Sequence, residues 1–569
     1  MSTFNLADLF EIVADAVPDR PALVAGDRRL TYAELDERST RLGRHLLGAG
    51  LDPGDHVAVV AWNRAEWLEA MLGAYKARLV PINVNYRYTA DELRHVLADA
   101  GCRAAIVEHA LLGPLATVVG ELPDLHHILG LDDGEAAPVG IAVVPYEDAL
   151  AAAPADRDHP AFRERSPDDR YVLYTGGTTG SPKGVVWRAE DIFFAALGGT
   201  TPERPRPERP EDLASRATEI VGARPWLVTS PMMHGNGQWN SLRPLFDGLA
   251  VVLWTGHRFD GAAVAELAAT ERAHLLVLVG DGMSLPFVDA VEAARTAGAP
   301  FDLSTVRVIA SGGAILSPVV KQRLTDVLPG AVIVDGFGAS ETGSNGRLIG
   351  ATGDGPPRFS MGPHTTVLDD DLRPVAPGTG EIGRLARRGH VPLGYWNDPA
   401  KTAATFPVDA AGTRWAIPGD HAIPEADGTI TLLGRGSACI NTGGEKVHPE
   451  EVAAAVKSHP DVADAIVVGA PDERFGQRVV AVVTAARSGA GADAGAPVPD
   501  LAGVRAHLAG RLAGYKAPRQ LVVVDELAYT AQGKPDLRWA ADLAAATPLP
   551  PSPSTPSSPD TATTTETRS

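Results

Sequence analysis

Short apolar segments of strand length alternate with amphipathic helical segments through much of the chain, and this alternation restricts the fold more than any other feature. Helical segments are expected at residues 64–77 and 89–100, each between apolar stretches. Such an alternation is typical of parallel strands in layered, doubly wound sheets. We therefore predict an α/β fold with ligand sites at the carboxyl ends of the strands. The expected strands are residues 56–62, 79–84, 102–107, 225–229, 274–279, 306–310 and 331–334.

The sequence pattern changes towards the C-terminus. Residues 417–435 are typical of a hairpin that turns at Asp427-Gly428. Beyond Arg435 we expect a small α+β domain, and from Thr547 the composition is of low complexity and typical of disorder. The elements expected in the small domain are a helix from Pro449, strands at 462–468 and 478–485, a helix at 500–513 and a strand at 520–524.

We therefore predict three parts. Residues 1–435 form a large N-terminal domain of doubly wound sheets plus a small distorted barrel or hairpin region, residues 436–545 form a smaller α+β domain, and residues 546–569 form a disordered tail. Within the first part, residues 200–217 are rich in Pro, Arg and Glu, and we expect them to be an exposed insertion rather than core.

The charge balance excludes several classes of partner. The chain has 51 Lys and Arg against 71 Asp and Glu, a net charge of −20, which disfavours nucleic acid or an anionic membrane surface as the main partner.

Its cysteines, Cys102 and Cys439, lack metal-ligand spacing. We find no secretory signal and no apolar run near the about 18 residues of a membrane span, so we expect a cytoplasmic protein without an integral membrane segment. A homodimer is left open.

A Gly- and Thr-rich segment, residues 174–184, follows a short apolar run and is typical of a phosphate-binding loop. Glycines allow backbone amides to turn towards phosphate oxygens, and Lys183 supplies a cation. The segment is not a Walker A loop, because Lys183 follows Pro182 and precedes Gly184 instead of opening a helix. The alternative is a plain surface turn. The predicted binding residues are Thr175, Gly176, Gly177, Thr178, Thr179, Gly180 and Lys183.

Two further segments follow expected strands and combine small with polar residues. In residues 311–314 small side chains let a flat ring lie against the backbone, and residues 335–343 offer an aromatic ring, Phe337, and an acid, Glu341. Glu341 suits Mg²⁺, which prefers carboxylate and phosphate oxygens. The alternatives are a tight turn and a helix cap. The predicted nucleotide-binding residues here are Gly312, Gly313, Ala314, Asp335, Gly336, Phe337, Gly338 and Ser340.

Two pairs of residues flank the expected hairpin, Gly419-Asp420 and Gly434-Arg435. A carboxylate and a guanidinium in these places can converge on one polyol, although an ordinary ion pair that ties the hairpin ends is the alternative. Further on, Lys534 lies on an expected turn, where taken alone it reads as a solvated lysine.

These motifs, in this order, resemble those of the adenylate-forming superfamily, which includes acyl-CoA synthetases, peptide-synthetase adenylation domains and beetle-type luciferases. The resemblance runs from about residue 20 to residue 540. It implies ATP, Mg²⁺ and coenzyme A as cofactors and co-substrates. It also implies that residues 311–314 contact adenine, that Asp420 and Arg435 hold the ribose, and that Glu341 carries the metal. The catalytic residues that it implies are Lys183, Glu341 and Lys534, the last reaching the acid carboxylate and the α-phosphate.

The same resemblance implies a mobile C-terminal domain that turns about a hinge at Ser437, where relatives usually carry Asp or Lys. It implies that residues 441–446 swing in to line a tunnel for the CoA thiol, with Gly443 and Gly444 admitting the narrow pantetheine arm. Lys516 is implied as a contact for a CoA phosphate. A simple loop at the entry to a helix is the alternative for residues 441–446.

Residues 231–239 match the family segment that bounds the acyl pocket. This segment lacks the Asp that amino-acid-activating relatives place near the position of His234, which favours an uncharged acid body. Met232, Met233 and Trp239 suit a large apolar acyl group, although such residues beside a strand are often core. The predicted pocket residues are His234, Gly235, Gln238, Trp239 and Gly282.

The sequence therefore predicts an AMP-forming acyl-CoA synthetase. The local sequences of residues 81–87 and 441–446 resemble those of bacterial fatty-acyl or steroid-side-chain CoA ligases. We therefore expect a medium- or long-chain or bulky apolar acid as the substrate. One alternative is a standalone adenylation enzyme that loads an acyl carrier protein. Another is a non-catalytic nucleotide sensor, which should have lost some of the key polar residues. Those residues, Lys183, Glu341, Asp420, Arg435 and Lys534, are all present.

Overall fold

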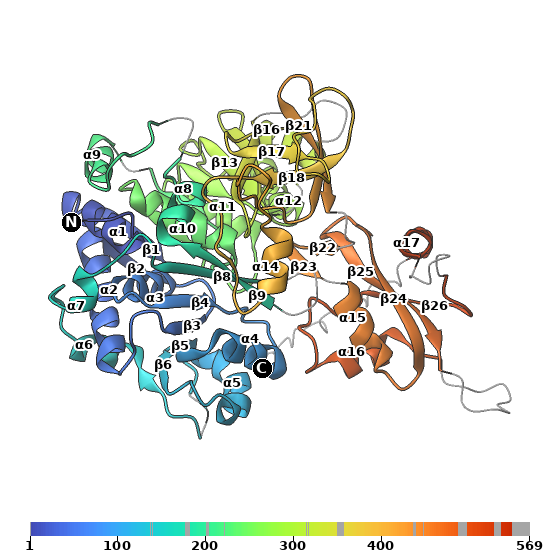
Figure 1. Cartoon of the computed structure of the whole chain (residues 1–569), viewed down its shortest axis with the longest axis horizontal. Coiled ribbons are helices and arrows are strands. Elements are labelled where there is room, and N and C mark those ends of the chain that lie inside the picture. Colours follow the sequence, from blue (N-terminus) through green and yellow to red (C-terminus); the bar gives the residue numbers. More distant parts are fainter. Residues whose placement is uncertain are drawn as a thin grey trace, which may run out of the picture.

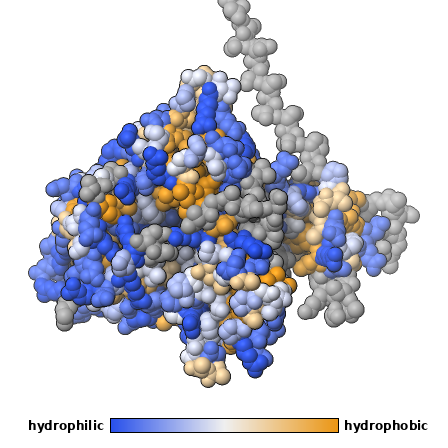
Figure 2. Space-filling view, turned by 90° about the horizontal axis from the view of Figure 1, so that it is seen from above, coloured by the Kyte–Doolittle hydropathy of each residue, from blue (hydrophilic) through white to orange (hydrophobic). Residues whose placement is uncertain are grey.

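The computed structural model shows a large N-terminal body with a smaller α+β unit beside it (Figure 1). It describes residues 2–136, 138, 140–176, 182–200, 204–220, 222, 224–313, 316, 318–349, 358–435, 440–447, 449–486, 498–528 and 536–548. The face in Figure 2 is mostly hydrophilic, with apolar side chains towards its middle, in keeping with the net charge of −20. Among the described residues, no helix has the length and apolar character to cross a bilayer.

The largest sheet has 13 strands, and one half of it is the predicted parallel sheet. The order in this half is β14-β13-β12-β10-β11-β1-β2, and all neighbours are parallel except β1 and β2. The strands are β1 (Pro21–Ala25), β2 (Arg28–Thr31), β10 (Trp226–Val228), β11 (Val251–Leu253), β12 (Leu275–Val277), β13 (Val308–Gly312) and β14 (Val332–Ala339).

Alternate strand residues face opposite layers, as the pleat of a strand requires. Leu275 belongs to one apolar cluster and its neighbour Leu276 to the other, so both faces of this sheet are buried beneath helices. The helices in the first cluster are α1 (Leu6–Ala16), α2 (Tyr32–Gly48), α3 (Ala65–Lys76), α6 (Tyr146–Ala152), α7 (Pro160–Arg163), α8 (Ala189–Ala196), α9 (Asp212–Glu219) and α10 (Gly235–Phe246). Those in the second are α11 (Gly261–Thr270), α12 (Gly280–Thr296) and α13 (Pro318–Val327).

The other half of this sheet is antiparallel and contains the predicted hairpin region. The hairpin of β20 and β21 turns through Asp427-Gly428, and Asp420 lies opposite Arg435 in its register, so this prediction is confirmed. The strands are β15 (Gly343–Ile349), β16 (Arg358–Met361), β17 (Thr365–Leu368), β18 (Gly383–Arg387), β20 (Asp420–Pro424) and β21 (Thr429–Arg435).

Two smaller sheets complete the N-terminal body. One is parallel, with β3 (His56–Val60), β4 (Val80–Asn83), β5 (Cys102–Glu108), β6 (His127–Leu131) and β7 (Val144–Pro145). Its associated helices are α4 (Ala90–Ala100), α5 (Leu112–Val118) and α6 (Tyr146–Ala152), with short 3₁₀ turns η1 (His109–Leu111) and η2 (Val119–Glu121). The other sheet is antiparallel, with β8 (Arg170–Gly176), β9 (Pro182–Arg188) and β19 (Gly394–Tyr395), next to α14 (Pro399–Thr405).

The C-terminal unit has its own sheet and its own apolar clusters. Its strands are β22 (Ile440–Thr442), β23 (Glu445–Val447), β24 (Val462–Asp472), β25 (Gly476–Ala485) and β26 (Gln520–Val523), and its helices are α15 (Pro449–Lys457), α16 (Leu501–Leu508) and α17 (Leu537–Ala546). The expected helix at 500–513 is shorter than predicted, because Ala509 is extended and Gly510 has a φ of +83°.

The predicted strands of the N-terminal domain are confirmed as β3, β4, β5, β10, β12, β13 and β14. The expectation for residues 200–217 is partly wrong. Residues 212–219 form α9, which packs on α1 and buries Leu213 and Ala217 in the main apolar cluster. Two apolar side chains four residues apart sufficed to anchor a segment whose composition is otherwise polar.

Helix α3 is buried along its whole length, so its charged residues need partners. Glu69 accepts hydrogen bonds from Arg38 and from the Tyr146 hydroxyl, and Lys76 Nζ donates to Asp36 and Thr40. The approach of α2 is equally close: a Cβ at Gly73 would lie 2.8 Å from the carbonyl oxygen of Ser39.

We therefore expect Gly73→Ala to destabilise the fold by about 1–3 kcal/mol, because α2 and α3 must separate to admit a methyl group. Gly48→Ala, at the end of α2 with open space around it, is the matched control and should leave stability unchanged or raise it. Thermal and urea unfolding measure both variants. Equal unfolding midpoints for Gly73→Ala and the wild type would contradict the close packing of these helices.

Candidate active site

A cavity of about 950 Å³ lies where the carboxyl ends of the parallel strands meet the C-terminal unit. Val277, Ser311 and Gly336, from the ends of β12, β13 and β14, line one side of it. Lys446 and Tyr515 of the C-terminal unit line another. The cavity thus occupies the edge that the predicted parallel sheet assigns to ligands.

Many of the predicted site residues line this cavity, although they come from distant parts of the sequence. The structure brings together the start of the predicted phosphate loop, both strand-end segments, the predicted acyl segment and the glycines of residues 441–446. These residues are Thr175, His234, Gly235, Trp239, Gly312, Gly313, Gly336, Phe337, Gly338, Ser340, Glu341, Gly443 and Gly444.

Several predicted residues lie outside the described part of the chain. They are Gly177, Thr178, Thr179, Gly180, Ala314, Ser437 and Lys534. Gly176 ends β8, and Arg435 is described by its backbone only, opposite Asp420. The chain enters β9, not a helix, at Pro182, which agrees with the prediction that residues 174–184 are not a Walker A loop.

Two predicted nucleotide ligands are engaged elsewhere. Lys183 lies on β9 and forms an ion pair with Asp398, the N-terminal cap of α14, and it does not line the cavity. Asp335 lies on β14, and its carboxylate is 3.2 Å from Nζ of the buried Lys321. Both ion pairs join residues remote in sequence, which is why residue spacing alone does not reveal them.

Three predicted pocket or CoA residues also do not line the cavity. Gln238 is buried, accepts from the Tyr171 hydroxyl at 2.6 Å and donates to Met232 O. Gly282, in the first turn of α12, is absent from the wall, where Met283 takes its place. Lys516 Nζ donates to Glu92 Oε1 at 2.7 Å.

The irregular segment 230–233 is held in place by two asparagines, Asn83 at the end of β4 and Asn63 in the bend between β3 and α3. Asn83 Nδ2 donates to Tyr174 O and to Met233 O, at 2.8 and 2.7 Å, and its Oδ1 accepts from Tyr174 N. Asn63 Oδ1 accepts from Met232 N, and its Nδ2 donates to Ser230 O. Side-chain amides satisfy backbone groups that no strand partner reaches, and so they position the start of the predicted phosphate loop.

Glu341 lies in the turn between β14 and β15 and is only 8% exposed. The Tyr395 hydroxyl donates to its Oε1 at 2.7 Å, and the indole of Trp187 donates to the carbonyl oxygen of Ser340 beside it. These bonds fix an acidic group on the cavity wall. A buried carboxylate in this place fits a hard divalent cation.

A buried carboxylate joins the two units at the cavity. Glu445 Oε1 of β23 accepts from Arg87 Nη1 at 2.5 Å and lies 3.2 Å from His234 Nε2. Burial alone would raise the pKa of Glu445, but the charge and hydrogen bond of His234, together with Arg87 and Lys516, outweigh burial and lower it. Glu445 is therefore a charged contact between the acyl segment and the C-terminal unit.

Sequence reasoning missed a large part of the wall. Asn83, Asn85 and Arg87 come from the end of β4 and the segment after it, and polar residues directly after a buried strand were a usable signal. The side formed by Phe194, Ala195 and Arg387 had no such signal, because these residues belong to elements that meet only in the folded chain.

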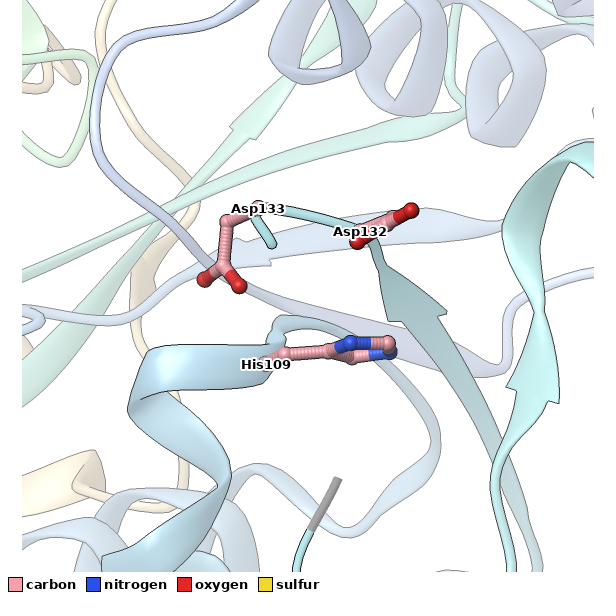
Figure 3. A group of neighbouring side chains, drawn as sticks. All are labelled: His109, Asp132 and Asp133. Atoms are coloured by element: carbon pink, nitrogen blue, oxygen red, sulfur yellow. The ribbon is translucent and has the colours of Figure 1, made fainter. Parts of the chain in front are cut away.

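A separate group, His109, Asp132 and Asp133, lies near the end of β6 (Figure 3). The candidate ligand atoms are within 4.8 Å of one another. The two oxygens of Asp133 already accept backbone N–H groups of Ala110 and Glu135. These hydrogen bonds account for the group as a stabilised surface turn, and we assign no metal to it.

Fold and site together define a two-domain α/β enzyme whose cavity at the strand ends is bordered by the smaller domain. The chain belongs to the AMP-binding enzyme family: the family model matches residues 10–396, and the model of the AMP-binding enzyme C-terminal domain matches residues 451–534.

Relatives match along nearly the whole chain. A 3-oxocholest-4-en-26-oate–CoA ligase of Rhodococcus rhodochrous is 43% identical over 552 residues, which cover 96% of both chains. A medium/long-chain-fatty-acid–CoA/3-oxocholest-4-en-26-oate–CoA ligase of Mycolicibacterium smegmatis is also 43% identical over 552 residues, 96% of this chain and 97% of that one. The solved amide bond synthetase McbA of Marinactinospora thermotolerans has a TM-score of 0.73 at 24% identity, covering 94% of this chain and 99% of that chain, which supports the fold.

We expect Glu445→Gln to loosen the contact between the two units, because Arg87 and His234 lose their charged partner. Hydrogen exchange followed by mass spectrometry should show faster exchange of residues 440–447 in Glu445→Gln than in the wild type. Glu473→Gln, on an exposed turn of the same unit, is the control and should exchange like the wild type.

The pH dependence has a definite sign. Because the pKa of Glu445 is lowered by folding, its contribution is complete above the ordinary carboxyl range and is lost as the pH falls through the lowered value. Exchange in the wild type should therefore approach that of Glu445→Gln only in acid. Indistinguishable exchange of the variant and the wild type at neutral pH would rule out this contact.

Proposed function

We propose that this protein is an ATP-dependent acyl-CoA synthetase that activates a medium- or long-chain or bulky apolar carboxylic acid as acyl-AMP and transfers it to coenzyme A. AMP and pyrophosphate are released. The observation that carries the proposal is the single cavity that the strand-end segments share with Gly443 and Gly444 of the C-terminal unit. Membership of the AMP-binding enzyme family supports it.

In the first half-reaction, a carboxylate oxygen of the acid attacks the α-phosphorus of ATP, and pyrophosphate leaves. Negative charge gathers on the phosphoryl oxygens, and a cation in a water-poor site stabilises it by several kcal/mol. We assign this cation to Lys534. We assign Lys183 to the leaving phosphates. To bind them, Lys183 must give up its ion pair with Asp398.

Other residues position the nucleotide. Gly312 and Gly313 leave room for adenine, while Asp420 and Arg435, opposite each other in the hairpin, are assigned to the ribose hydroxyls. Glu341 is assigned to Mg²⁺, which when bound neutralises triphosphate charge. The bond from Tyr395 keeps this carboxylate facing its site.

In the second half-reaction, the thiol sulfur of CoA attacks the acyl carbonyl carbon, and AMP leaves. Gly443 and Gly444 line the cavity. Their φ values are +59° and +85°, which residues with a side chain rarely adopt. We assign them to the pantetheine passage. We assign Lys516 to a CoA phosphate. To bind it, Lys516 must give up its hydrogen bond to Glu92.

Two half-reactions in one cavity need two arrangements of the smaller domain. We propose that residues 436–545 rotate on residues 1–435 about a hinge at Ser437. We also propose that the enzyme works in the cytoplasm, where ATP and CoA are available, as a monomer or a homodimer.

The residues that line the acyl part of the cavity indicate the class of acid. His234, Gly235 and Trp239 line the cavity, and residues 231–239 contain no carboxylate to pair with the ammonium group of an amino acid. This favours an acid without an ammonium group beside its reacting carboxylate, as do the names of the fatty-acid and steroid-acid ligases that the chain resembles.

The test is a screen of acids of graded length and bulk that measures AMP release with CoA, without CoA and with a phosphopantetheinylated carrier protein. Release that depends on both acid and CoA, together with acid-dependent pyrophosphate exchange, is the expected result. Release supported by carrier protein but not by CoA would replace the proposal with carrier loading, and no exchange with any acid would reject adenylation.

Lys534→Ala should abolish acyl-AMP formation and spare thioester formation from acyl-AMP added directly, because the lysine acts only while charge develops at phosphorus. Pyrophosphate exchange measures the first step, and thioester yield measures the second. Arg538→Ala, in the first turn of α17, is a nearby control and should preserve both. Equal loss of both half-reactions in Lys534→Ala would contradict the division of roles.

A further inference from the structure

Arg387, at the end of β18, is a buried cation on the cavity wall. The residue is 5% exposed and lines the cavity. Its Nη1 donates to the carbonyl oxygen of Ser344, which lines the same wall, and its Nε has no hydrogen-bond partner. Within the described part of the chain no carboxylate forms an ion pair with it, and burial lowers the pKa of Arg387 to about 10.

Two other buried cations of the chain are each neutralised by carboxylates. Arg165, which is about as buried, contacts the carboxylates of Asp8 and Glu11, and Lys76 contacts that of Asp36. A buried charge without a counter-charge is costly. Such a group on a cavity wall is a candidate for a functional role in which a ligand completes its interactions.

The surroundings of Arg387 are also positive. His364 lines the cavity, and its pKa is lowered by burial and by the positive charges of Arg387, His390 and Arg206, among others. Asp191 lies on this side, but it already accepts from His390 Nδ1 at 2.7 Å and pairs with Arg188. The wall therefore favours a ligand oxygen that carries negative charge or a negative dipole.

This wall is distinct from the segments assigned to ATP and CoA. It consists of the start of β15, the turn 362–364, the end of β18 and the end of α8. Apolar side chains, Phe194, Ala195 and Ala196, share it with Asn345, whose Oδ1 has no hydrogen-bond partner. Its composition suits an apolar body that carries one polar group.

We propose that Arg387 is a specificity-determining residue that donates a hydrogen bond to an oxygen acceptor, a ketone or a carboxylate, at the end of the acid remote from its reacting carboxyl group. This inference rests on the proposed ligase function and narrows its substrates to apolar acids with a second oxygen function. The reacting carboxylate lies at the strand ends with the nucleotide, and the second oxygen lies against β18.

The probes are built on the unbranched acid that the wild-type enzyme turns over best. They are that acid, the keto acids of the same length with the carbonyl moved along the chain, and the α,ω-dicarboxylic acid of the same length. A polycyclic acid with and without a ring ketone forms a rigid pair. The readout is kcat and KM for each acid, with KM for ATP measured in parallel.

The wild type should prefer a probe with an oxygen at one particular position by about tenfold or more in kcat/KM over the plain acid, as expected for a hydrogen bond from a charged donor. Arg387→Met should abolish this preference mainly through KM for the acid, and it should leave kcat/KM for the plain acid and KM for ATP within about twofold. Arg387→Lys, which keeps the charge and one donor, should retain part of the preference.

Arg388→Met is the matched control, because Arg388 is the next residue, is exposed and does not line the cavity. It should keep the wild-type preference. Thermal unfolding of each variant separates misfolding from altered selectivity, and Arg387→Lys tests the proposal if Arg387→Met does not fold.

Three outcomes would overturn the inference: no preference for any oxygenated probe in an active wild type, a preference that survives in Arg387→Met, or a change in KM for ATP instead of the acid. Each leaves the ligase function intact. Inactivity of the wild type on every acid would instead reject the proposed function.

Discussion

The parallel order of β10, β12, β13 and β14 is the constraint on which the site depends. Parallel strands place all their carboxyl ends at one edge of the sheet, so residues from the strand ends at Val277, Gly312 and Gly336 meet around one cavity. Because both faces of this sheet are covered by helices, the edge is where backbone groups remain accessible to a ligand. The smaller domain adds another part of the wall, with Gly443, Gly444, Lys446 and Tyr515.

Polar side chains fix the conformation of the irregular segments at this edge. Asn83 and Asn63 satisfy backbone groups of the segment 230–233, and Tyr395 holds Glu341. Each of these hydrogen bonds joins different elements. Fixing the loops in advance reduces the ordering that a bound substrate would otherwise have to supply.

Charge is distributed unevenly around the cavity. At the junction of the two units, the carboxylate of Glu445 is matched by Arg87 and His234, so this contact is electrostatically complete. On the wall of β18 the guanidinium of Arg387 has no such match among the described residues. The first arrangement holds the protein together, and the second leaves an interaction for a ligand to make.

The sequence by itself determined the fold class, most strands of the parallel sheets (β3, β4, β5, β10, β12, β13 and β14) and the hairpin at Asp427-Gly428. These features follow from local apolar periodicity and turn chemistry, which neighbouring residues encode. It also singled out segments that meet at the cavity, because small and polar residues directly after buried strands are a local signal.

Only the tertiary structure decided which of these side chains face the cavity. It paired Lys183 with Asp398 and Asp335 with Lys321, and it placed Gln238 behind the wall. It also buried part of residues 200–217 and set Arg387 beside Ser344. The physical reason is that ion pairs, burial and cavity walls join residues far apart in the chain, and no local pattern records which distant partner completes them.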